Sequence, residues 1–297
     1  MNIDSDALIS LLGKIMGFLN GGFFSALFGA FAGAWGAHKI AQSAKSRELI
    51  LDEIRSVNVA ITLVADICNA YIVLKKQMTI PMIGNYNEIK SRFEKHNPAI
   101  DGVFSFTADY ETFKAPLTST EQLKNFTIEN ITVNGRLLSA IFRLDSTSFH
   151  LKEMIEHRNK LISDIYEMRE KIDPIKSLEF FLGIKNELGT NKIYPDTLES
   201  IERYTDDVIF FSKIACEDLI QHGTMLTNKY KKKHKTNPPK LNILAFDKAE
   251  AMGLLPPIEN YQEWLQGFKD QKELKQKSKK LVLRWPITFT EKPEPNQ

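Results

Sequence analysis

The residue types best suited to chemistry in this chain are an arginine and a histidine, Arg143 and His150, with six residues between them. The sequence contains no phosphate-binding loop, no dinucleotide-binding fingerprint and no nucleophile motif. His157, His222 and His234 lack the spacing of metal ligands. We therefore expect no catalytic residue, metal or cofactor, and a protein that is not an enzyme, with Arg143 and His150 as the one catalytic alternative.

That alternative has a family counterpart. The spacing of Arg143 and His150 is similar to that in the helical ribonucleases called HEPN, which pair Arg and His in a dimer cleft. The resemblance implies a nuclease or nucleic-acid-binding protein tethered to a membrane. Leu144 departs from the family pattern, because a polar residue usually follows the arginine there.

A second polar group lies in the run EHRNK at residues 156–160. Arg158 and Asn159 could line a pocket. Charged residues in the middle of a helix more often form a solvated face or an ion pair between helices, so we expect one of these two arrangements.

The clearest basic cluster belongs to the run NKYKKKHK. Residues 1–228 hold 24 Lys/Arg against 29 Asp/Glu, whereas residues 229–284 hold 14 against 6. An anionic partner should therefore meet the C-terminal quarter. Three interpretations stay open: a solvated helix end, contact with anionic lipid and, less favoured, contact with nucleic acid. The candidate contact residues are Lys229, Lys231, Lys232, Lys233 and Lys235.

The most unusual stretch carries no charge. It runs for 23 residues, from 15 to 37, and would measure about 35 Å as a helix, enough to cross a hydrocarbon layer of about 30 Å. It holds six glycines, which are costly in a soluble helix and useful between membrane helices. These features predict a transmembrane helix at 15–37.

Small residues form two rows along this segment. Because they recur every four residues beside an aromatic ridge, they suit self-association through close backbone contact. We therefore expect a homo-oligomer in the lipid bilayer. The predicted oligomerisation face comprises Gly22, Ser25, Ala26, Gly29, Ala30, Gly33 and Ala37.

Three other interpretations of this segment stay open: a cleaved signal peptide, a buried helix of a soluble protein and a segment that inserts conditionally. Asp4 and Asp6 oppose the signal peptide, which needs a basic start. Positive residues follow the span, beginning with Lys39. The positive-inside rule then predicts that the N-terminus faces out of a bacterial inner membrane and that residues 38–297 are cytosolic.

The rest of the chain has the pattern of long helices, so the predicted fold class is mainly α: one transmembrane helix leading into an elongated antiparallel helical bundle. We expect loops and a short helix near 86–95 within 77–117, and minor β structure near 103–113 and 281–290. Helices are predicted at 44–76, at 176–188, at 247–254 and at 259–278. A further helical region begins at about 120, is interrupted at Asn134-Gly135, and continues to 172. Another long helix runs from Pro195, with Asp196 as candidate cap, to about 233.

This pattern divides the chain into four predicted parts: an extracytosolic N-terminus at 1–14, the transmembrane helix at 15–37, a long-helix bundle at 38–237, and a basic segment at 238–297 packed on the bundle. Cys68 and Cys216 fall on apolar helix sides, which predicts two buried free thiols.

The segment FFSALFGAFAGAWGAHKIAQSAKSRELILDEI, with what precedes and follows it, resembles a set of bacterial single-span membrane proteins with a cytosolic helical domain. Some of them are linked to anti-phage defence. The resemblance implies a membrane-anchored, self-associating protein that acts as an assembly or membrane effector component, with another membrane or defence-system protein as a further partner.

Overall fold

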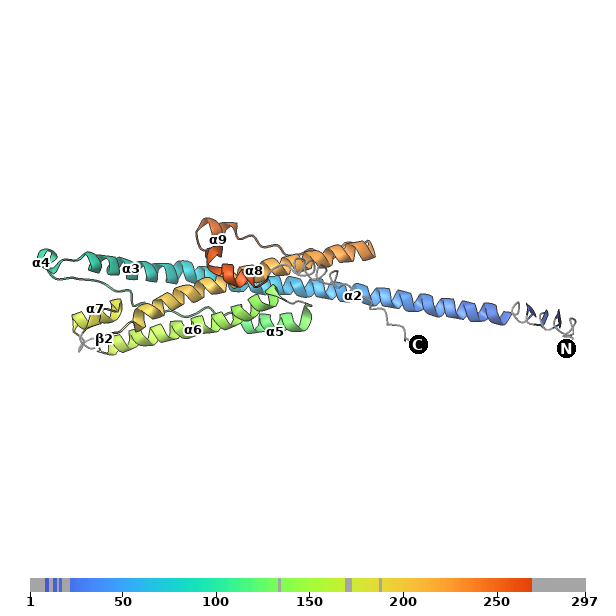
Figure 1. Cartoon of the computed structure of the whole chain (residues 1–297), viewed down its shortest axis with the longest axis horizontal. Coiled ribbons are helices and arrows are strands. Elements are labelled where there is room, and N and C mark those ends of the chain that lie inside the picture. Colours follow the sequence, from blue (N-terminus) through green and yellow to red (C-terminus); the bar gives the residue numbers. More distant parts are fainter. Residues whose placement is uncertain are drawn as a thin grey trace, which may run out of the picture. The chain divides into compact units, whose positions relative to one another are not determined.

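The part of the chain that the structure describes is mainly helical (Figure 1). The computed structural model describes residues 9–10, 13–14, 16–17, 22–132, 135–168, 173–186 and 189–268. The predicted mainly α class is confirmed, whereas the elongated antiparallel bundle stays a prediction. The predicted β structure at 281–290 lies outside the described residues. Contacts divide the chain into two units, Met1–Val59 with Ile220–Asn242, and Ala60–Leu219 with Ile243–Gln297.

Helix α2 (Gly22–Leu74) continues through a π-helical turn, η1 (Lys75–Thr79), into α3 (Ile80–Lys95). The prediction of loops between 77 and 85 is therefore wrong. Pro81 lies in the first turn of α3, directly after the π turn, where a missing backbone N–H is tolerated. The turn thus carries the helical path past a residue that would ordinarily end it.

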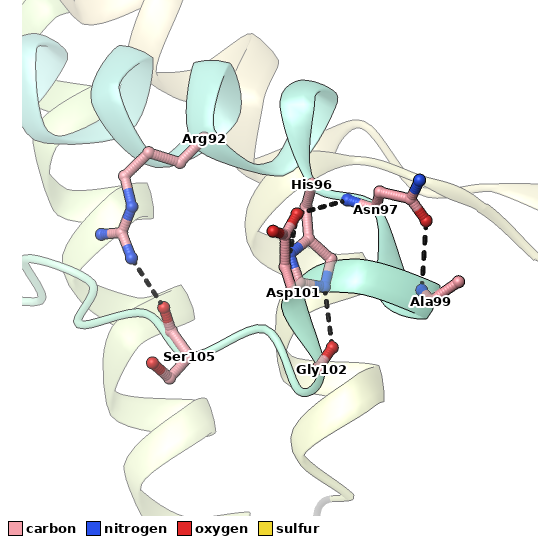
Figure 2. A network of polar contacts seen from close by, with 7 residues as sticks. All are labelled: Arg92, His96, Asn97, Ala99, Asp101, Gly102 and Ser105. Atoms are coloured by element: carbon pink, nitrogen blue, oxygen red, sulfur yellow. Dashed lines mark hydrogen bonds and ion pairs between the residues drawn. The ribbon is translucent and has the colours of Figure 1, made fainter.

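A tight corner ends this path, as Figure 2 shows. His96 Nε2 donates a hydrogen bond to the carbonyl of Gly102 at 3.0 Å. The Asn97 side chain caps the short helix α4 (Pro98–Asp101) by accepting from the Ala99 amide at 3.1 Å. Asp101 in turn accepts from the amide of Asn97 at 2.9 Å. Gly102 has φ of 72°, a conformation that favours glycine, so the corner depends on it.

The predicted β structure at 103–113 is wrong, since the segment pairs with no strand among the described residues. Its alternation reflects a different arrangement. Every second carbonyl accepts a hydrogen bond from a helix side chain, at Ser105, Thr107, Asp109, Glu111 and Phe113. The donors are Asn85 and Arg92 of α3, and Arg158 and Asn159 of α6 (Arg136–Met168). We call residues 103–119 the strap.

Helix α5 (Thr120–Asn130) and helix α6 confirm the predicted pair with a break before Gly135, which has φ of 67°. Asn134 lies outside the described residues. Ser119 stands at the start of α5 but its side chain makes no capping bond. The Thr120 hydroxyl donates to Asp145 at 3.1 Å instead, which ties the start of α5 to α6.

The predicted helix at 176–188 is shorter in the structure. Helix α7 (Pro174–Leu182) ends at Gly183, whose φ of 68° stops the helix. The chain then forms a two-residue strand pair, β1 (Lys185–Asn186) with β2 (Gly189–Thr190).

Helix α8 (Ile193–His234) confirms the predicted long helix. Its cap differs, because the Asn191 side chain accepts from the amide of Ile193 at 3.1 Å and Asp196 lies inside the first turn. The remaining helical elements are short: α9 (Asp247–Ala251), the 3-10 helix η2 (Ile258–Tyr261) and α10 (Gln262–Gln266). Helix α9 is shorter than the predicted 247–254, and the predicted end of the 259–278 helix lies outside the described residues.

Candidate functional site

Among the described residues, one helix is long and apolar enough to cross a membrane by length and composition, namely the continuous helix Ala26–Lys95. Its N-terminal portion, residues 26–40, is exposed at nearly every position. Phe28, Phe31 and Trp35 are 71%, 74% and 60% exposed. Apolar side chains of this size are rarely left in water together, so this portion is a candidate contact surface for lipid or a partner.

The predicted oligomerisation face lies on this surface. Ala26, Gly29, Ala30, Gly33 and Ala37 are all exposed. A Cβ placed on Gly29 or Gly33 would meet nothing within 4 Å. The side chain of Ser25 and the environment of Gly22 lie outside what the structure describes. The small-residue rows are therefore open along the described part of the helix.

One polar contact marks the end of this portion. The Lys39 ammonium lies 4.8 Å from the centroid of the Trp35 ring, a cation–π arrangement. An amphipathic ring beside a cation is typical of the boundary between hydrocarbon and water.

The basic cluster lies at the end of α8, in the same unit as this portion of α2. Lys229, Lys231, Lys232, Lys233 and Lys235 are all exposed. Within this unit His222 lies 3.1 Å from Glu53, and Tyr230 accepts a hydrogen bond from Arg47 at 2.9 Å. Lys233 donates to Ser46. Later residues of α8 thus contact earlier residues of α2. The lysines at the end of α8 therefore lie near the part of α2 that follows Lys39.

Two side chains shape this cluster. Hydrogen bonds from Thr236 and Arg47 lower the pKa of the Tyr230 phenol. Desolvation, with the charges of Lys233 and Arg47, lowers the pKa of His234. His234 Nε2 is shielded from solvent and has no hydrogen-bond partner among the described residues.

The catalytic alternative has a different setting. Arg143 and His150 are both exposed on α6, about 10 Å apart along its axis. His150 Nδ1 lies 3.5 Å from Glu153 Oε2, and its ring centroid is 6.0 Å from that of Tyr204. Seven residues are nearly two helical turns, so Arg143 and His150 lie on one face of α6, and no hydrogen bond or ion pair joins them among the described residues.

Arg158 and Asn159 correct a prediction. Arg158 is 1% exposed and forms no ion pair among the described residues. Its guanidinium donates to the carbonyls of Glu111 at 2.7 Å and Asp109 at 3.1 Å, and lies 5.4 Å from the Phe113 ring centroid. Asn159 donates to the Phe113 carbonyl at 2.6 Å. The pair holds the strap against α6, which is neither a solvated face nor a salt bridge.

The strap also borders a hollow of about 840 Å³. Tyr71 and Ser148 share a hydrogen bond of 2.6 Å in its wall, and Asp145 pairs there with Lys124. Its lining contains no histidine or cysteine that could activate the Ser148 hydroxyl. The lining residues therefore form neither a Ser–His nor a Cys–His pair.

Cys68 and Cys216 confirm the predicted buried free thiols. Burial raises the pKa of Cys68 to about 12 and that of Cys216 to about 11, so both are protonated at neutral pH. Within the described ranges no three His, Cys, Asp or Glu side chains gather as a metal site would require.

Comparisons of the chain with family models, with curated proteins and with solved structures give no match, so function must be argued from these residues.

Proposed function

We propose that this chain is a single-span membrane protein that self-associates through its small-residue rows and acts as an assembly or membrane effector component. The span is residues 15–37, the N-terminus faces out, and residues 38–297 lie in the cytosol of a bacterial cell. Anti-phage defence is the biological setting that the architectural resemblance favours.

One observation carries the proposal: residues 26–37 of α2 have no charged side chain and are exposed apart from half-buried Gly36, with Leu27, Phe28, Phe31 and Trp35 exposed along one side. A soluble helix keeps a polar face for water, and this portion has none before His38. Lipid satisfies such a helix because its backbone hydrogen bonds are all internal.

The anchor is tested with charges placed in the exposed portion. Lysine near the centre of a span costs about 3 kcal/mol, so Phe28→Lys with Phe31→Lys should move the chain from the carbonate-resistant membrane fraction to the soluble fraction. Val73→Lys is the matched control, because Val73 is an exposed apolar residue of the same helix outside the span, 49% exposed.

The topology is tested with protease added to intact spheroplasts, which should leave residues 38–297 undigested. Digestion from outside would reverse the orientation. Release of the unaltered chain by carbonate would remove the span, and would favour a buried helix of a soluble protein.

A further inference from the structure

The unit that contains the exposed portion of α2 also holds a groove of about 610 Å³ between α2 and the end of α8. Arg47, Arg55 and His234 line it, together with Glu48 and apolar residues beginning with Ile40. The described residues of this unit, 22–59 and 220–242, carry ten Lys/Arg against three Asp/Glu. An anion is therefore the ligand that the local charge favours.

Arg47 is held in place for such a ligand. Its Nε donates to the Tyr230 hydroxyl at 2.9 Å, and Tyr230 is fixed by a second hydrogen bond from Thr236 at 3.3 Å. The two terminal nitrogens of Arg47 make no hydrogen bond to the described residues. An oriented guanidinium with both terminal nitrogens unused matches the geometry of a phosphate group.

His234 adds an independent sign of a missing partner. A nitrogen hidden from water without a hydrogen bond is uncommon in folded proteins, and a ligand oxygen would satisfy it. Desolvation and, after it, the positive charges of Lys233 and Arg47 lower the pKa of His234. Bound phosphate would offset their charge and accept a hydrogen bond from Nε2.

The acidic side chains leave most of this charge unopposed. Asp52 is paired with Arg55 at 2.8 Å, and Glu53 with His222 at 3.1 Å. Glu48 lines the groove and is the one carboxylate in its wall. Arg47 lines the groove without a carboxylate partner among the described residues, and Lys233, which precedes His234 in the chain and donates to Ser46, adds a second positive charge nearby.

The groove begins at the level of the lipid head groups if the span is residues 15–37, because Ile40 follows Ala37 by three residues, about 5 Å along the helix. Arg47 follows Ala37 by ten residues, about 15 Å along the helix, and tilt and the long side chain reduce that height. The head-group layer begins at the end of the span. Ile40, Ala44 and Leu51 add apolar surface to the groove, which suits a lipid better than a nucleic acid.

We propose that this groove binds the phosphate of an anionic membrane lipid, with Arg47, Lys233 and His234 as its contacts. The proposal rests on the membrane anchoring proposed above.

Native mass spectrometry of the full chain, released from detergent after equilibration with phosphatidylglycerol or phosphatidylcholine, tests it. The chain should retain phosphatidylglycerol in preference. Each lost cation should weaken retention about fivefold, so Arg47→Gln with Lys233→Gln should weaken it roughly 25-fold. Glutamine keeps a donor for Tyr230, and circular dichroism checks that the variant is folded.

Lys76→Gln with Lys90→Gln is the matched control, since it removes two exposed charges from the other unit. Equal retention by this control and by wild type is expected. Retention that survives Arg47→Gln with Lys233→Gln, in a chain that stays anchored, would overturn the site and leave the anchor intact. Release of the wild-type chain by carbonate would overturn the anchor itself.

Two further arms separate other phosphate sources. Inorganic phosphate should not displace the lipid at millimolar concentration; displacement would assign the groove to a free phosphate. A labelled single-stranded oligonucleotide should not displace the lipid either. If it displaces lipid from the wild-type chain, and the Arg47→Gln variant does not bind the oligonucleotide, the groove is assigned to nucleic acid.

Discussion

Helix α2 carries two apolar stretches that differ in how their residues are arranged. From residue 50 onward the apolar residues recur at alternating steps of four and three and are buried, whereas Thr62, Asp66 and Asn69 on the other side are exposed. Residues 26–37 carry no charged side chain on any side and are exposed, except for half-buried Gly36. The buried positions are Ile50, Ile54, Val57, Ile61, Val64, Cys68 and Tyr71.

The two stretches differ in whether apolar residues form a stripe along one side of the helix, and this decides whether the helix can pack within the chain. A stripe of apolar residues pairs with other parts of the same chain and leaves a polar side for water. A helix without a polar side can bury one side in this way, but its other side then leaves apolar surface in water. This is why we propose a partner outside the chain for residues 26–37, namely lipid or another copy.

The largest expected effect separates the two stretches by stability. Ile61 is fully buried, so Ile61→Ala should lower the free energy of unfolding by about 3 kcal/mol. Phe31→Ala removes a larger side chain that is 74% exposed, and should change it by less than about 0.5 kcal/mol. Denaturant unfolding of the full chain in mild detergent measures both. Equal losses would mean that Phe31 packs within the chain.

The helices show how far the sequence alone leads. Helix α8 and the break before Gly135 were predictable because apolar periodicity and a glycine in a left-handed conformation are local signals. The path through Pro81 was not, because a π turn has no composition of its own. The alternation at 103–113 was visible, but its hydrogen-bond partners come from side chains of α3 and α6.

Arg158 shows where a signal was present and misinterpreted. It stands in step with Leu151, Ile155 and Ile162, which are all buried on α6. A charged residue within an apolar stripe is expected to be buried and to need hydrogen bonds that offset its loss of hydration. The carbonyls of the strap accept these hydrogen bonds. The groove at Arg47 had no such signal, since its two sides lie about 190 residues apart in sequence.

The next effect concerns association in the membrane. Gly33→Leu should separate helices that pack through the small-residue rows, and should lower the cross-linked oligomer population by about an order of magnitude, roughly 1.4 kcal/mol. Phe28→Leu, on the ridge, should change it much less because lipid accepts either side chain. Cross-linking in native membranes measures both. The opposite result, with only Phe28→Leu collapsing the ladder, would place the interface on the aromatic ridge.

Alanine substitutions at two glycines test the same difference between packed and exposed parts of the chain, with a smaller expected change in stability. A Cβ on Gly223 of α8 would lie 2.7 Å from Leu241 Cδ2 and 3.0 Å from Val57 Cγ1, so Gly223 permits close packing inside the chain. Gly223→Ala should therefore destabilise the fold by about 1 kcal/mol, after the gain in helix propensity is subtracted. Gly29→Ala meets open space and should leave the unfolding of the detergent-solubilised chain unchanged or slightly improved. A loss at Gly29 matching that at Gly223 would contradict the assignment of the exposed glycines to contacts outside the chain.

The smallest expected effect is that of replacing exposed polar residues, which we compare with replacing small residues of the exposed apolar stretch. Arg143 and His150 lie on the surface of α6, and replacing each with alanine should change stability by less than about 0.5 kcal/mol. The double variant Arg143→Ala with His150→Ala should also keep full protection in a phage plaque assay, because the proposed action is oligomerisation and not cleavage. Gly29→Leu with Gly33→Leu should abolish protection. Loss of protection in the alanine variant, with membrane association and cross-linking intact, would instead favour a membrane-tethered nuclease whose Arg–His site forms between copies.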